Sequence, residues 1–124
     1  NRLAEGTHRA VKHWGLETIC QDPKAYSPTL TAVLLPDGHD ADAFRALALE
    51  NFNISYGASF GRFAGKMFRI GHLGDVNETS MIGALGATEL ALQMAGVPIK
   101  KGGAQAAMDY FLSDMSSGAR KAAE

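Results

Sequence analysis

The sequence predicts an α+β domain in which a small, mostly antiparallel sheet of about four strands is covered by helices. Short runs of β-branched and aliphatic residues alternate with segments of helical periodicity, and Gly or Pro stands at most of the borders between them. The 124 residues fit a single core, because domains most often contain about 100 to 150 residues. With 46% hydrophobic and 20% charged residues, the composition is that of a globular chain.

The N-terminal half is predicted to contain two helices and three strands. Apolar residues recur at helical spacing before Gly15, which stands where a helix C-cap would. A β-branched and aliphatic run that ends at Pro36 is typical of a buried strand. Asp40 provides an N-cap for the amphipathic helix that follows. In chain order, we expect a helix over residues 2–14, strands over 16–20 and 29–35, a helix over 40–52 and a strand over 53–56.

The C-terminal half is predicted to contain one strand and two helices. Asp75 and Glu78 have the spacing of a capping box, so a long helix is expected to start there, and Gly96 is expected to end it. The polar residues after the last amphipathic helix are expected to fray. In chain order, we expect a Gly-rich loop over 57–66, a strand over 67–71, the long helix, a helix over 104–115 and a polar tail over 116–124, with the folded domain spanning 1–115.

Charge and cysteine content exclude several classes of function. Twelve Lys and Arg against thirteen Asp and Glu leave a net charge of −1, which argues against a nucleic-acid partner. The most apolar stretch, 81–97, is interrupted by Glu89 and Gln93 and is shorter than the roughly 18 residues of a membrane span, so we predict no membrane partner. Cys20 is the only cysteine. A lone thiol is typical of a reducing compartment, and we predict a cytoplasmic protein.

Metal and nucleotide sites are not favoured by the motifs. The four histidines and the lone cysteine follow no ligand spacing, and His8 and His13 are five apart, so they do not share a helix face. Gly65-Lys66 is similar to the end of a nucleotide-binding loop, but Phe60 and Met67 stand where that motif needs Gly and Ser or Thr. We predict no metal ligands. The Gly-rich loop is interpreted either as a mobile connection or as the border of a ligand site.

Arg69 is the most informative residue, because it lies within an otherwise apolar strand. Alternation puts Met67 and Arg69 on one face of this strand and Phe68 and Ile70 on the other. A guanidinium buried in such surroundings requires an anion. Either a carboxylate of this chain such as Asp75 supplies it, or a ligand carboxylate does, which the planar fork grips with two charge-assisted hydrogen bonds. Simple exposure on an edge strand is a third interpretation.

Two motifs around Arg69 resemble those of class V aminotransferases. They are Tyr56-Gly57-Ala58-Ser59-Phe60-Gly61 and Ala64-Gly65-Lys66-Met67-Phe68-Arg69-Ile70-Gly71-His72-Leu73-Gly74-Asp75. The chain looks most similar to the serine-glyoxylate branch, and alanine-glyoxylate aminotransferase is a more distant relative. The resemblance covers the chain from about Leu3 to Val97. It implies the C-terminal small domain of a fold type I transferase that depends on pyridoxal 5'-phosphate.

The resemblance also implies roles for individual residues. Arg69 matches the arginine that binds the α-carboxylate of the amino acid or keto acid. Ser59, Gly57 and His72 are further candidate substrate-binding residues near the large domain, although His72 is also interpreted as a helix-entry residue that hydrogen-bonds a backbone carbonyl. Lys66 lies in the wrong motif to be the lysine that forms the aldimine. It is interpreted as a solvated charge at the end of the strand.

The family's cofactor-binding residues belong to a large domain that would precede Asn1. We therefore expect the 124 residues alone to bind no pyridoxal phosphate tightly and to catalyse no reaction. The absence of an initiator Met and the immediate helical pattern are interpreted in the same way, as signs of a piece of a longer protein. The parent is predicted to be a homodimer that transfers an amino group from serine or alanine to glyoxylate. The alternatives are a stand-alone regulatory module that binds an amino acid through Arg69, and a dimerisation or scaffold piece.

Overall fold

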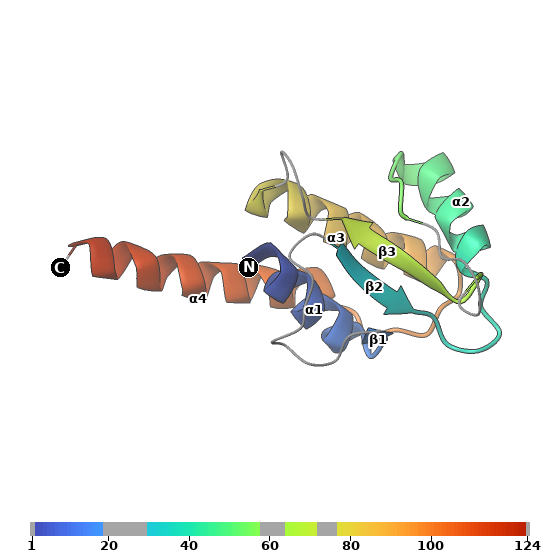
Figure 1. The fold of residues 1–124 in the computed structure, drawn as a ribbon, viewed down its shortest axis with the longest axis horizontal. Helices are drawn as coiled ribbons and strands as arrows, with labels where there is room; N and C mark the ends of the chain where they lie inside the picture. Colours follow the sequence, from blue (N-terminus) through green and yellow to red (C-terminus); the bar gives the residue numbers. More distant parts are fainter. Residues whose placement is uncertain (1, 19–29, 58–63, 72–76, 124) are drawn as a thin grey trace.

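Four helices and a three-stranded antiparallel sheet form the protein in a computed structural model that describes residues 2–18, 30–57, 64–71 and 77–123 (Figure 1). The predicted α+β class is confirmed. Among these residues, no helix has both the length and the apolar character needed to cross a lipid bilayer. The elements in chain order are α1 (Arg2–Trp14), β1 (Glu17–Thr18), β2 (Leu30–Leu34), α2 (Ala41–Phe52), β3 (Met67–Gly71), α3 (Glu78–Met94) and α4 (Gly103–Ala123).

The sheet has the order β1-β2-β3, and both neighbouring pairs are antiparallel. In the register of β2 and β3, Val33 lies opposite Phe68 and Ala32 lies opposite Arg69. Val33 and Phe68 are fully buried, whereas Ala32 and Arg69 are only half-buried. Side chains alternate between the two faces of a strand, so the arginine lies on the face opposite the core, as the sequence predicts.

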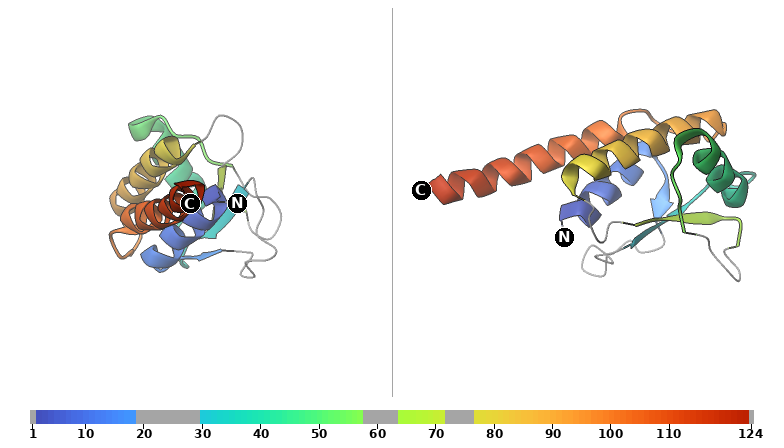
Figure 2. Two further views of the ribbon diagram at one scale, coloured as in Figure 1. Left: turned by 90° about the vertical axis from the view of Figure 1, so that its left-hand side faces the viewer. Right: turned by 90° about the horizontal axis from the view of Figure 1, so that it is seen from above.

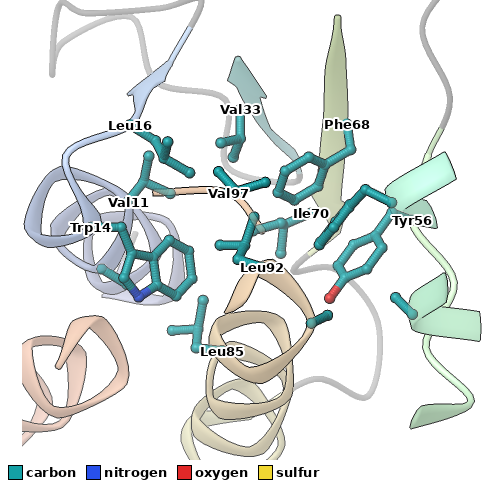
Figure 3. Close-up of a cluster of buried hydrophobic side chains, with 14 of the residues drawn as sticks. Val11, Trp14, Leu16, Val33, Tyr56, Phe68, Ile70, Leu85, Leu92 and Val97 are labelled. Carbon is teal, nitrogen blue, oxygen red and sulfur yellow. The ribbon is translucent and has the colours of Figure 1, made fainter. Parts of the chain in front are cut away.

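The core lies on the other face of the sheet, against α1 and α3. Figure 2 shows α1, α3 and α4 on the same side of the sheet. In Figure 3, Val33 and Phe68 of the sheet and Trp14 of α1 point toward the region around Leu92 of α3. All four side chains are at most 1% exposed. Burying large apolar side chains contributes about 1.5 to 3 kcal/mol for each one, so this layer holds the sheet against the helices.

The predicted strand over 53–56 is wrong, and it accounts for the difference between four predicted strands and three observed among the described residues. Asn53 ends α2 in the left-handed conformation, with φ at 55°, and donates its backbone N–H to the carbonyl of Leu49. The N–H of Ile54 donates back to the carbonyl of Ala48 at 3.4 Å. The bond from Asn53 to Leu49 is that of an αL helix end. The two hydrogen bonds use the amides that a strand would have offered to β3. Among the described residues, this segment pairs with β3 through a bridge at Gly57.

The start of α3 also differs from the prediction. Its N-cap is Asn77, whose side-chain oxygen accepts from the backbone N–H of Ser80 at 2.9 Å. The Ser80 hydroxyl accepts from the N–H of Asn77 at 2.9 Å, which completes a capping box. The predicted box on Asp75 and Glu78 is therefore wrong: Asp75 lies outside the described residues, and Glu78 is the first residue of α3 and pairs with Arg2 at 2.8 Å. By contrast, the predicted N-cap at Asp40 is confirmed.

The last helix is longer than the sequence predicts. It was expected to end at Met115 and to give way to a frayed tail, but α4 continues to Ala123. Residues 119–123 consist of Ala, Arg and Lys, which are strong helix formers, and this local preference explains the extension. In Figures 1 and 2, the C-terminal part of α4 extends beyond α1 and α3. The division of the chain into a domain over 1–115 and a tail over 116–124 stays a prediction.

Glu89 connects three helices through one carboxylate oxygen. Its Oε1 accepts from the indole N–H of Trp14 at 2.7 Å and from the backbone amides of Gly102 and Gly103 at 2.9 and 2.8 Å. Those amides lie at the start of α4, where the free N–H groups of a helix attract negative charge. Burial opposes ionisation of this carboxyl group, but the hydrogen bonds outweigh burial, and the pKa of Glu89 is lowered.

Candidate functional site

Arg69 occupies the middle of β3 and has a backbone neighbour on each side. Ala32 of β2 lies opposite it on one side, and Gly57 forms an isolated antiparallel bridge with it on the other. Gly57 and Arg69 exchange two backbone hydrogen bonds, each 3.1 Å long between nitrogen and oxygen. The backbone of the arginine is therefore fixed on both sides, and its half-buried side chain lies on the face away from the core.

Gly57 also sets the path of the Arg69 side chain. A Cβ atom at position 57 would lie 3.2 Å from the Cβ of Arg69 and 3.6 Å from its Nε. The stem of the arginine therefore runs across the face of Gly57, and any other residue at position 57 would press against it. Glycine suits this position because two segments of the backbone approach closely, which is one of the uses of a residue without a side chain.

The sheet face around Arg69 is apolar. Alternation along the strands puts Ala32 and Leu34 of β2 and Met67 of β3 on this face. Met67 is 8% exposed, and the other two are half-buried. Apolar neighbours lower the local dielectric constant and strengthen a hydrogen-bonded pair between a guanidinium and a carboxylate. An arginine on such a face has the chemistry to pair with a carboxylate through its planar fork.

Tyr56 anchors the segment that carries Gly57. Its ring packs against Phe44 and Phe68, with centroid distances of 5.5 and 5.1 Å. Its hydroxyl lies 2.5 Å from Oγ1 of Thr88, which itself donates to the carbonyl of Ala84, so the Tyr56 hydroxyl is the donor to Thr88. Burial raises the pKa of Tyr56 to about 12.

Arg45 is a residue of this site that the sequence analysis missed. It projects from α2, and its Nε donates to the backbone carbonyl of Tyr56 at 3.1 Å. Its Nη1 lies 3.2 Å from the Asp42 carboxylate, three residues earlier in the same helix. The spacing of Asp42 and Arg45 was the one signal in the sequence, and it indicates an ordinary ion pair on a helix surface. Nothing in the sequence indicates that Arg45 reaches the loop after α2.

The other predicted site residues cannot all be compared with Arg69. Ser59 and His72 lie outside the described residues, and so does Asp75, the internal carboxylate that could have paired with Arg69. Their roles stay predictions, as does the choice between an internal and a ligand carboxylate for Arg69. Gly57 is placed directly beside Arg69. Among the described residues, no three His, Cys, Asp or Glu side chains are grouped so as to hold a metal ion.

The cavity that Lys66 lines does not fit pyridoxal phosphate. A cavity of about 1170 Å³ lies beside β1 and the turn before α2, and Lys66 lines it. Glu17, Asp37, Asp40 and Asp42 line the same cavity, and their carboxylates would repel a phosphate group. Lys66 itself is exposed, as expected for a solvated charge at the end of a strand.

Known proteins that are similar to this chain in sequence and in structure are aminotransferases. The serine-glyoxylate aminotransferase of Hyphomicrobium methylovorum is 44% identical over 119 residues, which cover 95% of this chain and 29% of that enzyme. The L-aspartate-glyoxylate aminotransferase of Paracoccus denitrificans is 34% identical over 124 residues, 99% of this chain and 31% of that enzyme. The crystal structure of the ureidoglycine-glyoxylate aminotransferase of Bacillus subtilis superposes with a TM-score of 0.79 at 30% identity, over 89% of this chain and 29% of that one. No protein-family model matches the chain.

The chain thus shares its small antiparallel sheet with helices on one side with solved aminotransferase structures. Over nearly its whole length the chain is similar to part of class V aminotransferases, in particular to serine-glyoxylate enzymes, which is consistent with a C-terminal small domain of that class. It spans less than a third of the length of the curated relatives described above.

Proposed function

We propose that this chain is the substrate-binding small domain of an aminotransferase that uses glyoxylate as amino acceptor, and that Arg69 binds the substrate α-carboxylate. The position of Arg69 carries the proposal: a half-buried guanidinium on an apolar sheet face, within a motif of the family. Three similar proteins are named for different amino donors, namely serine, aspartate and ureidoglycine, but all three names include glyoxylate. Serine is the proposed donor, with alanine as the alternative.

One arginine is sufficient for both halves of such a reaction. The amino acid that gives up its amino group and the keto acid that receives it each carry a carboxylate next to the reacting carbon. A guanidinium fork binds that group with two parallel hydrogen bonds and so fixes the orientation of either substrate. Discrimination between donors then depends on groups that contact the rest of the substrate. This division of tasks agrees with relatives that share an acceptor and differ in their donors.

The remaining parts of the proposed enzyme lie outside the described residues. Pyridoxal 5'-phosphate is the proposed cofactor, and it supplies the electron sink that amino-group transfer requires. Its proposed site is in a large domain of the same enzyme, which is the partner of this chain. We further propose a homodimer located in the cytoplasm, as the sequence analysis predicts.

The decisive experiment is to replace Arg69 in the full-length enzyme that carries this chain. Arg69→Ala removes hydrogen bonds to a charged group, so the KM for both serine and glyoxylate is expected to rise about tenfold to a hundredfold. Arg69→Lys is expected to be impaired as well, because an ammonium group keeps the charge but lacks the planar fork. The absorbance of bound pyridoxal phosphate should be unchanged in both variants. Wild-type KM values in Arg69→Ala would contradict the assignment.

The regulatory-module alternative predicts a different result with the 124-residue chain alone. Such a module binds its amino acid without a partner domain. Titration calorimetry of the chain with serine, alanine and glyoxylate is expected to show no binding if the substrate site is completed by a large domain. Saturable binding of serine or alanine by the isolated chain would favour the module.

A further inference from the structure

We propose that Arg45 is a positioning residue for the Arg69 site and that it acts through the peptide group between Tyr56 and Gly57. This inference rests on the proposed role of Arg69. Arg45 belongs to α2 and touches neither substrate nor cofactor in the proposal. Its role is to hold the backbone against which Arg69 is oriented.

The first step of the argument is the hydrogen bond from Arg45 to the loop. The Nε of Arg45 donates to the carbonyl oxygen of Tyr56 at 3.1 Å, eleven residues along the chain. The Arg45 side chain is 29% exposed, whereas its ion-pair partner Asp42 is 58% exposed. The bond to the carbonyl is partly buried. It is therefore the more shielded of the two interactions, and it is worth more than a surface ion pair.

The second step is the geometry of one peptide group. The carbonyl of Tyr56 and the N–H of Gly57 belong to the same rigid plane, and in a trans peptide they point in opposite directions. No cis peptide bond occurs among the described residues. On one side of this peptide group, Arg45 of α2 donates to the carbonyl oxygen of Tyr56. On the other side, the N–H of Gly57 donates to the carbonyl of Arg69 in β3 at 3.1 Å. Loss of the Arg45 bond frees the plane to rotate and weakens the bridge on the other side.

The third step connects this bridge to the arginine side chain. Gly57 accepts the N–H of Arg69 as well as donating to it, and the stem of Arg69 passes within van der Waals distance of Gly57. A shift of Gly57 therefore changes both the backbone and the side-chain path of Arg69. Tyr56 limits such a shift on the core side through its ring and its hydroxyl, but it does not hold the orientation of its own carbonyl. Among the described residues, the side chain that donates to this carbonyl is that of Arg45.

The test uses kinetic measurements on the full-length enzyme with five variants. Arg45→Met removes the donors and keeps the apolar stem, and it is expected to raise the KM for both substrates about twofold to tenfold, the effect of one net hydrogen bond. Asp42→Asn is the matched control: it removes the ion pair, leaves the bond to Tyr56 in place and should behave as wild type. Arg45→Lys keeps a charged donor and is expected to be intermediate. Arg69→Ala and the double variant with Arg45→Met complete the cycle.

A merely structural role would not produce the expected coupling. If Arg45 acts through Arg69, Arg45→Met should have no further effect on KM in the Arg69→Ala background, because the group it positions is gone. An equal effect in both backgrounds would overturn the positioning role while leaving the role of Arg69 intact. So would a wild-type KM in Arg45→Met when Arg69→Ala is impaired. A wild-type KM in Arg69→Ala would instead overturn the proposed function, and the positioning role with it. If Arg45→Met does not fold, Arg45→Lys takes its place in the cycle.

Discussion

Two charged residues, Glu89 and Arg45, hold backbone groups in comparable ways, but with different consequences. Among the helices, the Glu89 carboxylate accepts hydrogen bonds from Trp14 of α1 and from the backbone amides at the start of α4. At the sheet edge, the Arg45 guanidinium holds the carbonyl of Tyr56, and the same peptide group pairs with Arg69. The first arrangement connects parts of the core, whereas the second orients a side chain that faces away from it.

The difference shows that the same kind of interaction, a charged side chain bonded to backbone groups, serves stability in one region and function in the other. The partners of Glu89 are all within the fold, so its loss leaves donors without acceptors and is felt by the whole domain. The bonds at the sheet edge fix a local conformation beside a chain that is already paired with β2 on its other side. We therefore expect substitutions around Glu89 to lower the free energy of unfolding, and substitutions around Gly57 to alter substrate use with little change in stability.

Replacement of Glu89 should give the largest effect. Glu89→Ala leaves the indole N–H of Trp14 and the amides of Gly102 and Gly103 without their acceptor. Combining a lost helix cap with an unpaired buried donor, we expect a loss of about 2 to 4 kcal/mol in the free energy of unfolding. Urea-induced unfolding of the chain, followed by circular dichroism, measures it. Glu50→Ala, an exposed carboxylate on α2, is the control and should change stability by less than about 0.5 kcal/mol.

Glu89 should also make the free energy of unfolding depend on pH in the acid range. The pKa of Glu89 is lowered in the folded state, so its contribution is present above the usual value of 4.5 and is lost as the pH falls through the folded-state pKa. Glu89→Gln keeps one oxygen acceptor and carries no titrating group. Its free energy of unfolding should therefore vary less with pH below 4.5 than that of the wild type. An identical acid dependence in the two proteins would show that the hydrogen bonds of Glu89 do not favour its ionised form.

The opposite behaviour is expected at Gly57. In Gly57→Ala, the new methyl group would lie 3.2 Å from the Cβ of Arg69, and the stem of the arginine must move by a few tenths of an ångström. We expect the KM for amino acid and keto acid to rise by up to about tenfold in the full-length enzyme, by analogy with the loss of one hydrogen bond. The unfolding midpoint should remain close to that of the wild type. A protein that is strongly destabilised but binds substrate normally would reverse the proposed division between the two regions.

Sequence periodicity was sufficient for most of the fold, because it reports which face of an element is buried. The helix over 2–14, the strand over 67–71 and the N-cap at Asp40 follow from local patterns and are confirmed. The strand predicted over 53–56 failed for a reason that periodicity does not contain. Asn53 adopts a left-handed conformation and turns the next amides back to α2, so the helix end competed successfully with the sheet for the same hydrogen bonds.

The residues of the candidate site could be predicted only where a charged side chain stands in an otherwise apolar stretch of sequence. Arg69 stands out because a cation interrupts an apolar strand, and Glu89 interrupts an apolar stretch in the same way. Arg45 gave no such signal, because a charged residue on the polar face of an amphipathic helix is ordinary. Its contact with Tyr56 depends on the path of the chain after α2, which is a tertiary property. Positioning residues of this kind are found by tracing the hydrogen bonds of the backbone around a known group.

Substitution of Tyr56 should have the smallest effect, and it tests both regions at once. The ring of Tyr56 belongs to the core, whereas its backbone belongs to the site. Tyr56→Phe removes the hydrogen bond to Thr88, but Thr88 still donates to Ala84 at 2.7 Å, so no donor is orphaned. We expect a loss of about 0.5 to 1.5 kcal/mol in the free energy of unfolding at neutral pH. The KM values of the full-length enzyme should be unchanged, because the carbonyl of residue 56 remains available to Arg45.

The stability of the protein at alkaline pH tests whether the Tyr56 hydroxyl is buried as described. Because burial raises the pKa of Tyr56 from 10.0 to about 12, the folded state holds its proton more tightly than the unfolded state. The stability that this provides is complete below pH 10 and is lost as the pH rises to about 12. Tyr56→Phe lacks the group, so the unfolding free energies of the two proteins should converge over that range, while other titrating groups affect both proteins alike. Curves that stay parallel would mean that the phenol is accessible to solvent, and the anchor on the core side of Gly57 would be weaker than the packing of its ring implies.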